Sequence, residues 1–223
     1  MPASAARKAA SPSKKTSARS KSAADAALPS LPSPYHHGAL HAGLLAAAQG
    51  ILETEGLEGL TLRAAARAAG VSHAAPKNHF GDLTGLLSEL AALGFRHFTE
   101  VLRSAQSFDA AGHAYVAFAQ DHPAMFLLMF RSERLDMQRP ALAEAVAASR
   151  EALADAASRS LGIARDAQAP ASPAQIARMV GAWSLVHGFA MLLIDGRLAN
   201  TLRAWPGGAD WHSLLAAMLE RRS

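Results

Sequence analysis

The stretch Thr61–Phe80, TLRAAARAAGVSHAAPKNHF, decides the fold of this chain. Its first half has apolar side chains at the spacing of one helix face, namely Leu62, Ala65, Ala66 and Ala69. Gly70 follows where the chain must turn, and glycine accepts a positive φ there without a steric penalty. Ser72 is a good N-cap for a second helix. The pattern predicts a helix-turn-helix, whose second helix normally enters the major groove of DNA.

The composition favours a helical protein and excludes several kinds of chemistry. Of the 223 residues, 50% are hydrophobic and 6% are aromatic, a balance that favours close packing of alanine-rich helices. The absence of cysteine excludes disulfides, thiolate zinc sites and cysteine nucleophiles. No uninterrupted apolar run reaches the roughly 18 residues that span a bilayer, and the basic N-terminus lacks the apolar stretch of a secretory signal. We therefore expect a soluble, cytoplasmic protein without a membrane partner.

Residues 1–34 form a basic tail. They carry six lysine and arginine side chains against one acid, Asp25, whereas the whole chain has a net charge of +4. The basic character therefore belongs to the tail and not to the folded body. Because the tail is rich in Ala, Ser, Pro and Lys and has no apolar periodicity, we expect it to be disordered. It is either a solvated tail or a polycationic arm that adds salt-sensitive phosphate contacts.

The remaining sequence predicts helices and no strands. The expected helices cover about 37–55 (ended by Gly56), 61–69 (capped by Thr61), 82–103 (capped by Asp82), 109–120 (capped by Asp109), a short segment opening at Pro123, 140–161, 173–198 (beginning at Ser172-Pro173) and 210–221 (capped by Asp210), with 164–171 as a loop. The predicted fold class is all-α. An N-terminal three-helix DNA-binding domain covers 35–98, and a C-terminal helical domain for ligand binding and dimerisation covers 99–223.

Residues 59–87, GLTLRAAARAAGVSHAAPKNHFGDLTGLL, resemble the DNA-binding domain of the tetracycline-repressor (TetR) family of bacterial transcription regulators. The matching positions are Leu60, Thr61, Arg63, the turn 69–72, His79, Phe80, Asp82 and Leu86. Tyr35–Gly38 also resembles the arm that opens one subgroup of the family. AWSLVHG at 182–188, followed by DGR at 195–197, resembles a Trp-His-Gly type of ligand-binding and dimerisation domain in that subgroup.

The motif supplies a set of candidate DNA contacts. A helix N-terminus offers N–H groups to a phosphate, to which Thr61 adds a hydroxyl and Arg63 a charge. Asn78 can hydrogen-bond base edges, and Lys77 can reach guanine or a phosphate. Ala74 and its neighbour Ala75 allow a close backbone approach and contact with a thymine methyl. The full predicted set is Thr61, Arg63, Ser72, His73, Ala74, Lys77, Asn78 and His79, with Phe80 packed inside.

Two positions depart from what the family usually carries. Lys77 stands where members usually have a tyrosine, so an aromatic phosphate contact is replaced by a charge. Pro76 is the fifth residue counted from Ser72, where it removes about one helical hydrogen bond. Proline at this place recurs in the subgroup, and we expect it to shape the recognition helix.

The C-terminal half holds the candidate effector site. The predicted ligand-binding residues are Phe118, Met125, Phe126, Met129, Phe130, Trp183 and His187. Methionines suit a pocket because they adapt to varied apolar ligands, but the same stripe also suits a core, and His187 can instead satisfy a buried backbone group. In the family, the helices equivalent to 173–198 and 210–221 pair with their copies as a four-helix bundle. The resemblance thus implies a homodimer that reads a palindrome with half-sites about one helical turn apart.

These features predict a ligand-responsive, sequence-specific transcriptional regulator, most simply a repressor released from its operator by an unknown small molecule. The alternative is a non-specific, nucleoid-type DNA binder driven by the basic tail. We expect no enzyme activity and no cofactor, because no nucleophile–base spacing is recognisable. His37 and His41 lie one turn apart beside His36, but without acids at useful spacing we predict no metal site.

Overall fold

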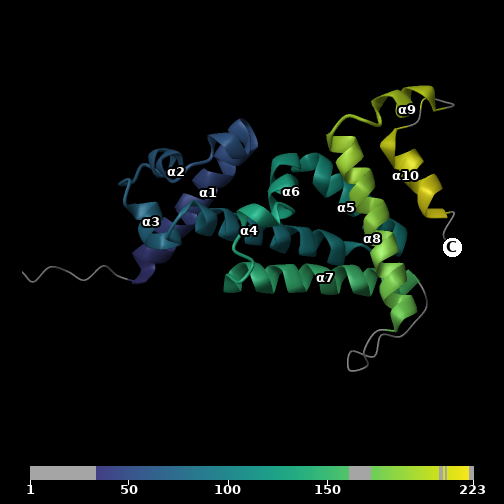
Figure 1. The fold of residues 1–223 in the computed structure, drawn as a ribbon, viewed down its shortest axis with the longest axis horizontal. Coiled ribbons are helices and arrows are strands. Elements are labelled where there is room, and N and C mark those ends of the chain that lie inside the picture. The colour runs from purple at the N-terminus through teal and green to yellow at the C-terminus, as the bar shows by residue number, and fades with distance from the viewer. Residues whose placement is uncertain (1–33, 161–171, 206–207, 209, 221–223) are drawn as a thin grey trace, which may run out of the picture. The chain divides into compact units, whose positions relative to one another are not determined.

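The computed structural model describes residues 34–160, 172–205, 208 and 210–220. Every regular element within these ranges is a helix, as predicted. The elements are α1 (Pro34–Gly59), α2 (Leu62–Ala68), α3 (Ala75–Phe80), α4 (Leu83–Ser104), α5 (Phe108–Asp121), α6 (Pro123–Met129), the 3-10 turn η1 (Ser132–Arg134), α7 (Pro140–Ser160), α8 (Pro173–Ile194), α9 (Ala199–Ala204) and α10 (Trp211–Glu220) (Figure 1). Residues 1–33 of the predicted tail and the predicted loop 164–171 lie outside the described residues.

Local capping chemistry explains the boundaries around the motif. The path of α1 leaves helical geometry at Gly56, with φ 72° and ψ −173°. Thr61 Oγ1 accepts the N–H of Ala64 at 3.1 Å, and Asp82 Oδ1 accepts the N–H of Gly85 at 2.8 Å. Each cap satisfies an N–H that has no partner within the first helical turn. The predicted breaks and caps at these three positions are confirmed.

Gly70 ends α2 with a Schellman motif. Its φ is +67°, and the N–H of Val71 reaches back to the carbonyl of Ala66 at 3.0 Å. The N–H of Gly70 itself donates to the carbonyl of Arg67 at 3.2 Å. This pair of bonds requires a left-handed residue at the turn, which glycine adopts without strain. The predicted role of Gly70 is confirmed.

Two predicted boundaries in the C-terminal half are wrong. The cap of α5 is Ser107, whose Oγ accepts the N–H of Ala110 at 3.1 Å, and Asp109 lies within the first turn. The long helix predicted over 173–198 stops at Ile194. Gly196, at φ +69°, closes a second Schellman motif there, and a short helix that was not predicted, α9, follows.

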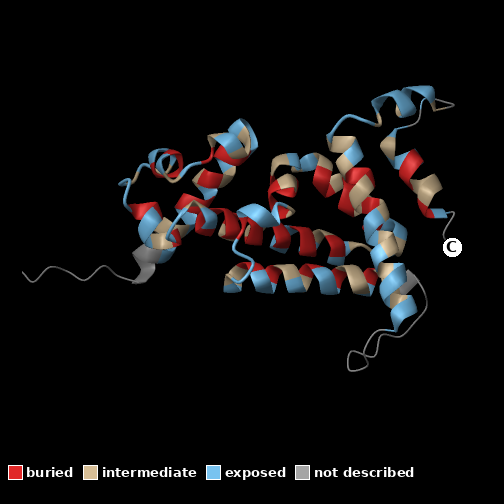
Figure 2. Cartoon of the chain, viewed as in Figure 1, coloured by how far each residue is buried: buried red, intermediate tan, exposed pale blue. Residues whose placement is uncertain are grey.

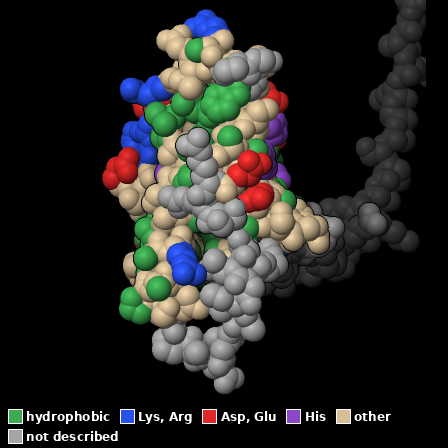
Figure 3. Space-filling model, turned by 90° about the vertical axis from the view of Figure 1, so that its right-hand side faces the viewer, with side chains coloured by type: hydrophobic (Ala, Val, Ile, Leu, Met, Phe, Trp, Pro, Cys, Tyr) green, Lys and Arg blue, Asp and Glu red, His purple; other side chains and the backbone are tan. Residues whose placement is uncertain are grey.

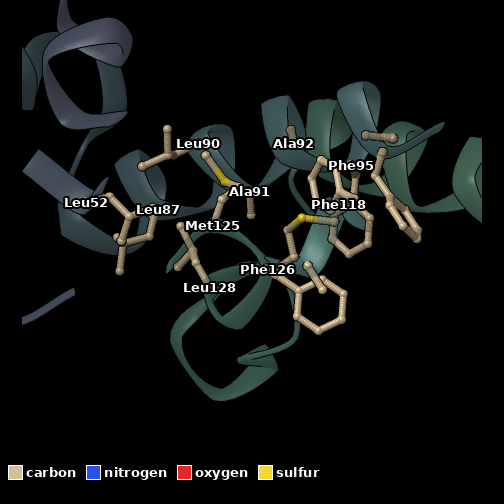
Figure 4. Close-up of a cluster of buried hydrophobic side chains, with 14 of the residues drawn as sticks. Leu52, Leu87, Leu90, Ala91, Ala92, Phe95, Phe118, Met125, Phe126 and Leu128 are labelled. Atoms are coloured by element: carbon tan, nitrogen blue, oxygen red, sulfur yellow. The ribbon is translucent and has the colours of Figure 1, made fainter. Parts of the chain in front are cut away.

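The core is built around α4, which packs against α1, α3, α5, α6 and α7. Buried residues run along its length (Figure 2). Figure 4 shows side chains from α1, α4, α5 and α6 in one apolar cluster. The approach to α6 is close at Gly94, where an added Cβ would lie 2.8 Å from the sulfurs of both Met125 and Met129. A larger residue at Gly94 would therefore require the side chains of Met125 and Met129 to move.

Residues 34–223 form one compact unit. The division predicted between residues 98 and 99 falls inside α4, which is continuous from Leu83 to Ser104. The residues on either side of that division therefore share one helix, and α4 runs from the helix-turn-helix into the C-terminal helices. The division at residues 98 and 99 remains a prediction about function.

Candidate functional site

The helix-turn-helix is anchored through its inner face. Leu60 and Phe80 are each 2% exposed, and Ala65 is fully buried. These side chains belong to the same core as α1 and α4. The short helices α2 and α3 are therefore fixed by packing, because helices of this length are not stable alone in water.

The recognition helix α3 begins at Ala75, so the prediction that Ser72 caps it is wrong. Its N-cap is Ala74, without a side-chain cap bond, and the carbonyl of Ser72 accepts the N–H of Ala75 at 3.0 Å. Pro76 explains the later start. A helix beginning at His73 would need a hydrogen bond from residue 76 to Ser72, which proline cannot donate. In the observed helix Pro76 occupies the first turn, where no such bond is required.

The outer face presents most of the predicted DNA-contact residues. Seven are exposed, namely Thr61, Arg63, Ser72, His73, Ala74, Lys77 and Asn78. His79 is half-buried, and its ring centroid lies 5.9 Å from that of His41 and 6.2 Å from that of Phe80. The idea that Ala75 approaches DNA is not supported, because its side chain is 9% exposed and packs in the core. The structure thus brings seven of the eight residues to the surface of one small motif.

The charge of this motif differs from that of the folded body as a whole. From Thr61 to Gly81 the chain has three cations, Arg63, Arg67 and Lys77, and no acid. Arg67 is exposed on α2 and was missed as a candidate. Counting charge over the motif, instead of over the whole folded part, would have found it. A basic surface without acidic side chains attracts the negatively charged phosphate backbone of DNA.

A polar network supports the end of the recognition helix. The Phe80 carbonyl lies 3.5 Å from Arg139 Nη1, and an added Cβ on Gly85 would lie only 2.0 Å from the same oxygen. Glu89 of α4 binds Arg139 Nη2 at 2.6 Å and His41 Nε2 at 2.7 Å. The end of α3 therefore packs against Gly85 of α4 and contacts Arg139, the residue before α7.

His41 is thus held by a carboxylate. The side chains of His36 and His37 lie outside the described residues. In the part of the chain whose side chains are described, no group of three or more histidine, aspartate or glutamate side chains is placed to hold a metal ion.

A cavity of about 580 Å³ lies among the C-terminal helices. Residues of α4, α5, α7 and α8, the last residue of α6 and the segment after it line the cavity. Its wall is mainly apolar and rich in rings, including Phe95, Phe98, Phe108, Phe130 and Trp183. The polar lining residues are Tyr115, Ser132, Ser149 and Arg150. Its size and lining are those of small-molecule sites.

The predicted ligand-binding residues divide into two groups. Met129, Phe130 and Trp183 line the cavity. Phe118, Met125 and Phe126 do not, and they are at most 5% exposed within the core (Figure 4). The stripe was ambiguous in sequence because an α6 residue that faces α4 and one that faces the cavity are equally apolar. His187 is outside the lining, but it touches residues that form it.

Tyr115, Trp183 and His187 form a hydrogen-bonded group at the cavity wall. Trp183 Nε1 donates to Tyr115 Oη at 3.3 Å, and Tyr115 Oη lies 2.9 Å from His187 Nδ1. The tyrosine hydrogen needs an acceptor, so Nδ1 accepts and the imidazole proton sits on Nε2. Burial lowers the pKa of His187 and raises the pKa of Tyr115 well above its usual value. All three groups are therefore neutral at pH 7. Tyr115 was missed, although a tyrosine amid helix-forming apolar residues signals a need for a polar partner.

The helix α8 leaves several large apolar side chains uncovered. Ile176, Val180, Trp183 and Leu192 are between 41% and 47% exposed, and they are four of the five large apolar side chains exposed in the described part of the chain. Figure 3 shows hydrophobic side chains on the surface at the end of the molecule that carries α8 to α10. By length and composition α8 also passes for a membrane-spanning helix, which the sequence had not suggested. Arg178 and His187 interrupt its apolar character, and the helix packs on α5 and α7.

Several known proteins resemble this chain. The family profile described as "Tetracyclin repressor-like, C-terminal domain" matches residues 108–218. A structure of a protein of unknown function from Rhodococcus sp. RHA1 is 33% identical, covers 84% of this chain and 95% of its own, and has a TM-score of 0.65. The candidate regulatory protein SCO4313 is 23% identical, with 86% and 98% coverage and a TM-score of 0.66. A candidate TetR-family transcription regulator from Shewanella sp. PV-4 is 15% identical, with 82% and 97% coverage and a TM-score of 0.56. No curated protein matches the sequence.

One long helix, α4, joins an exposed helix-turn-helix to the helices around the cavity. This arrangement defines a class of transcription regulators that combine a DNA-binding motif and a small-molecule cavity in one chain. The profile match over residues 108–218 identifies the family. The chain belongs to the tetracycline-repressor-like (TetR) family of transcription regulators.

Proposed function

We propose that this protein is a homodimeric repressor that binds a palindromic operator and releases it when a small molecule occupies the C-terminal cavity. The observation that carries the proposal is the exposed, acid-free face of α2 and α3, with Lys77 and Asn78 outward and Phe80 anchored in the core. Asn78 would read base edges, while Arg63 and the N-terminus of α2 would hold a phosphate.

Dimerisation would use α8 and α10. The exposed Leu192 of α8 supports this role, since it lies about 160° around the helix from Ile176, on the side away from the cavity-lining Val180 and Trp183. The corrected bounds of the two helices are Pro173–Ile194 and Trp211–Glu220. A two-fold pair of α3 helices would then meet half-sites about one turn of DNA apart. We assign the Leu192 side of α8 to a second copy of the chain and place the protein in the cytoplasm, as expected for the family.

Release would travel along α4. Gly85 of α4 lies under the end of α3, and Phe95 and Phe98 of the same helix line the cavity. Ten residues of helix separate Gly85 from Phe95, a span of about 15 Å. A ligand that binds a shifted α4 more tightly would favour a state in which the two recognition helices have a different spacing. The shift in the equilibrium between the two states is limited by the difference in ligand affinity for them.

The deciding experiment is selection of the purified full chain on random duplex DNA at near-physiological salt, followed by sequencing. A recovered palindrome would support a dimeric sequence-specific regulator. Lys77→Ala and Asn78→Ala should then abolish its shift on a gel, while Arg103→Ala, an exposed control at the other end of α4, should not. Recovery of no motif, with binding lost when residues 1–33 are deleted, would instead identify a non-specific binder driven by the tail.

A further inference from the structure

The cavity wall carries one charge. Among the described lining residues, Arg150 of α7 is the single ionisable side chain that is charged at neutral pH, and none of them is an aspartate or glutamate. His187 adds no charge behind the wall because burial lowers its pKa. The lining is otherwise made of rings, aliphatic chains and a few hydroxyls. A net positive charge thus stands beside a large apolar volume.

Arg150 has no counter-charge in the described structure. The positions one turn away on α7 are apolar, namely Val146, Ala147, Leu153 and Ala154. Another wall, α8, contains no acid at all. The ion pairs of the described residues leave Arg150 out. Arg150 is an exposed residue, and no hydrogen bond within the described residues uses the five N–H donors of its guanidinium.

The indole and two of the three hydroxyl groups of the wall, those of Tyr115 and Ser149, are already engaged. Trp183 donates to Tyr115, and Tyr115 donates to His187. The hydroxyl of Ser149, next to Arg150 on α7, donates to the carbonyl of Val146 at 2.8 Å. Among the described lining residues the cavity therefore offers side-chain donors at Arg150 and Ser132 and no anionic acceptor. A ligand with an anionic head satisfies Arg150, whereas a cation would find only aromatic faces.

We propose that the effector is a small apolar monocarboxylate, whose hydrophobic body fills the ring-lined cavity and whose carboxylate binds Arg150. That this ligand releases DNA rests on the proposed function. Binding of the ligand to the cavity does not, and it is measured without DNA. Arg150 is the residue that selects the anionic head, because a planar guanidinium binds a carboxylate through two parallel hydrogen bonds.

The test is isothermal titration calorimetry with probes that share a body and differ in the head. One series is decanoate, decanol and decyltrimethylammonium. The second is naphthoate, naphthalene methanol and naphthylmethylammonium, because a wall rich in rings suits a flat body. In at least one series, the carboxylate should bind about tenfold more tightly than the alcohol. The cation should bind more weakly than either.

The variant Arg150→Gln keeps a polar, hydrogen-bonding side chain but removes the charge. It should lower carboxylate affinity to that of the alcohol and leave the alcohol unchanged, so that any loss of folding is visible as a loss of both. Arg178→Gln, at an exposed arginine of α8 that does not line the cavity, should bind like the unaltered protein. Added salt should narrow the carboxylate preference.

Three results would overturn the proposal: tighter binding of the cation, an unchanged carboxylate preference in Arg150→Gln, or binding of neither carboxylate. None of them bears on whether α3 reads DNA, which the selection on random duplexes decides. Conversely, carboxylate binding through Arg150 with no recovered DNA motif would keep the ligand class and reject the regulator. The two ideas thus fail separately.

Discussion

Arg139 and Glu89 are 50 residues apart in the chain and form a two-point contact, with Arg139 Nη2 and Nε at 2.6 and 3.0 Å from the same carboxylate oxygen of Glu89. The side chains are 24% and 17% exposed. The backbone next to them is also fixed, because the N–H of Asp136 donates to Ser88 Oγ at 2.8 Å. The segment between η1 and α7 is therefore tied to the N-terminal half of α4, beside the end of the recognition helix.

Replacing Arg139 by glutamine should lower both stability and operator affinity. The change leaves the Glu89 carboxylate paired only with His41 and removes the donor near the Phe80 carbonyl. We expect a loss of about 1–3 kcal/mol in the free energy of unfolding by urea, typical of a charged hydrogen bond that is partly buried. A gel-shift titration on the selected operator measures the affinity.

Arg134→Gln is the matched control for this pair. Arg134 lies 3.8 Å from Glu58, whose side chain is 90% exposed. An ion pair in such exposure contributes about 0–1 kcal/mol, so this variant should behave almost like the unaltered protein. Equal losses in the two variants would contradict a special role for Arg139.

Gly85→Ala should displace the recognition helix. The new Cβ would lie 2.0 Å from the backbone oxygen of Phe80, and a backbone atom cannot turn aside as a flexible side chain can. The end of α3 must therefore shift, at a cost of about 1–3 kcal/mol, and operator affinity should fall with it. Urea unfolding and the gel-shift titration together report the two effects.

The same substitution at Gly43 provides the contrast. Gly43 lies within α1 and has nothing within 4 Å of an added Cβ. Alanine there should stabilise the protein by about 0.5–1 kcal/mol, because glycine loses more conformational freedom in a helix. If Gly85→Ala also proved stabilising, the close contact with Phe80 would be wrong.

Stability should fall at acidic pH because of His187. Burial lowers the pKa of its imidazole in the folded protein, so below the unfolded-state pKa of about 6.5 the unfolded chain binds the proton more readily. This contribution to stability is fully present above that pKa and is lost as the pH falls toward the lower folded pKa. The groups that face His187, namely Tyr115, Phe126, Phe130 and Trp183, carry no charge in this window.

Urea unfolding between about pH 7 and pH 5 measures this effect. His187→Gln keeps an acceptor for Tyr115 but does not titrate, so its stability should fall less steeply over that range. His113→Gln is the control, because His113 contacts His212 of α10 and not His187. This variant should retain the steep slope. An identical slope in His187→Gln would exclude His187 as the source.

A charge at Leu192 of α8 should dissociate the dimer. Leu192 is 42% exposed, so Leu192→Glu should change the stability of a single subunit by less than about 0.5 kcal/mol. In a dimer the same carboxylate would be buried without a partner. Sedimentation velocity should therefore show a monomer, with the far-ultraviolet helix signal retained.

Ala147→Glu places the same charge on an exposed position of α7 and should leave the sedimentation unchanged. If Leu192→Glu sedimented like the unaltered protein, α8 would not be the dimer interface.

The sequence alone determined those features that depend on a few neighbouring residues. Thr61 and Asp82 cap helices because each has a side-chain oxygen three residues before an N–H without a helical partner. Gly70 must turn the chain because the Schellman bonds need a positive φ. Even the error at Ser72 was local in origin, since the position of Pro76 was sufficient to predict a helix that starts at Ala75.

Only the tertiary structure decided which apolar residues form a core and which form a cavity. Met125 and Met129 are one turn apart on α6 and equally apolar, yet only Met129 lines the cavity. The contacts of Arg139 with Glu89 and of Tyr115 with His187 join residues 50 and 72 positions apart. Helical periodicity tells which face of a helix is apolar, but it carries no information on which helix that face meets. The packing of α4 against its neighbours supplies that information, and with it the cavity and the support beneath the recognition helix.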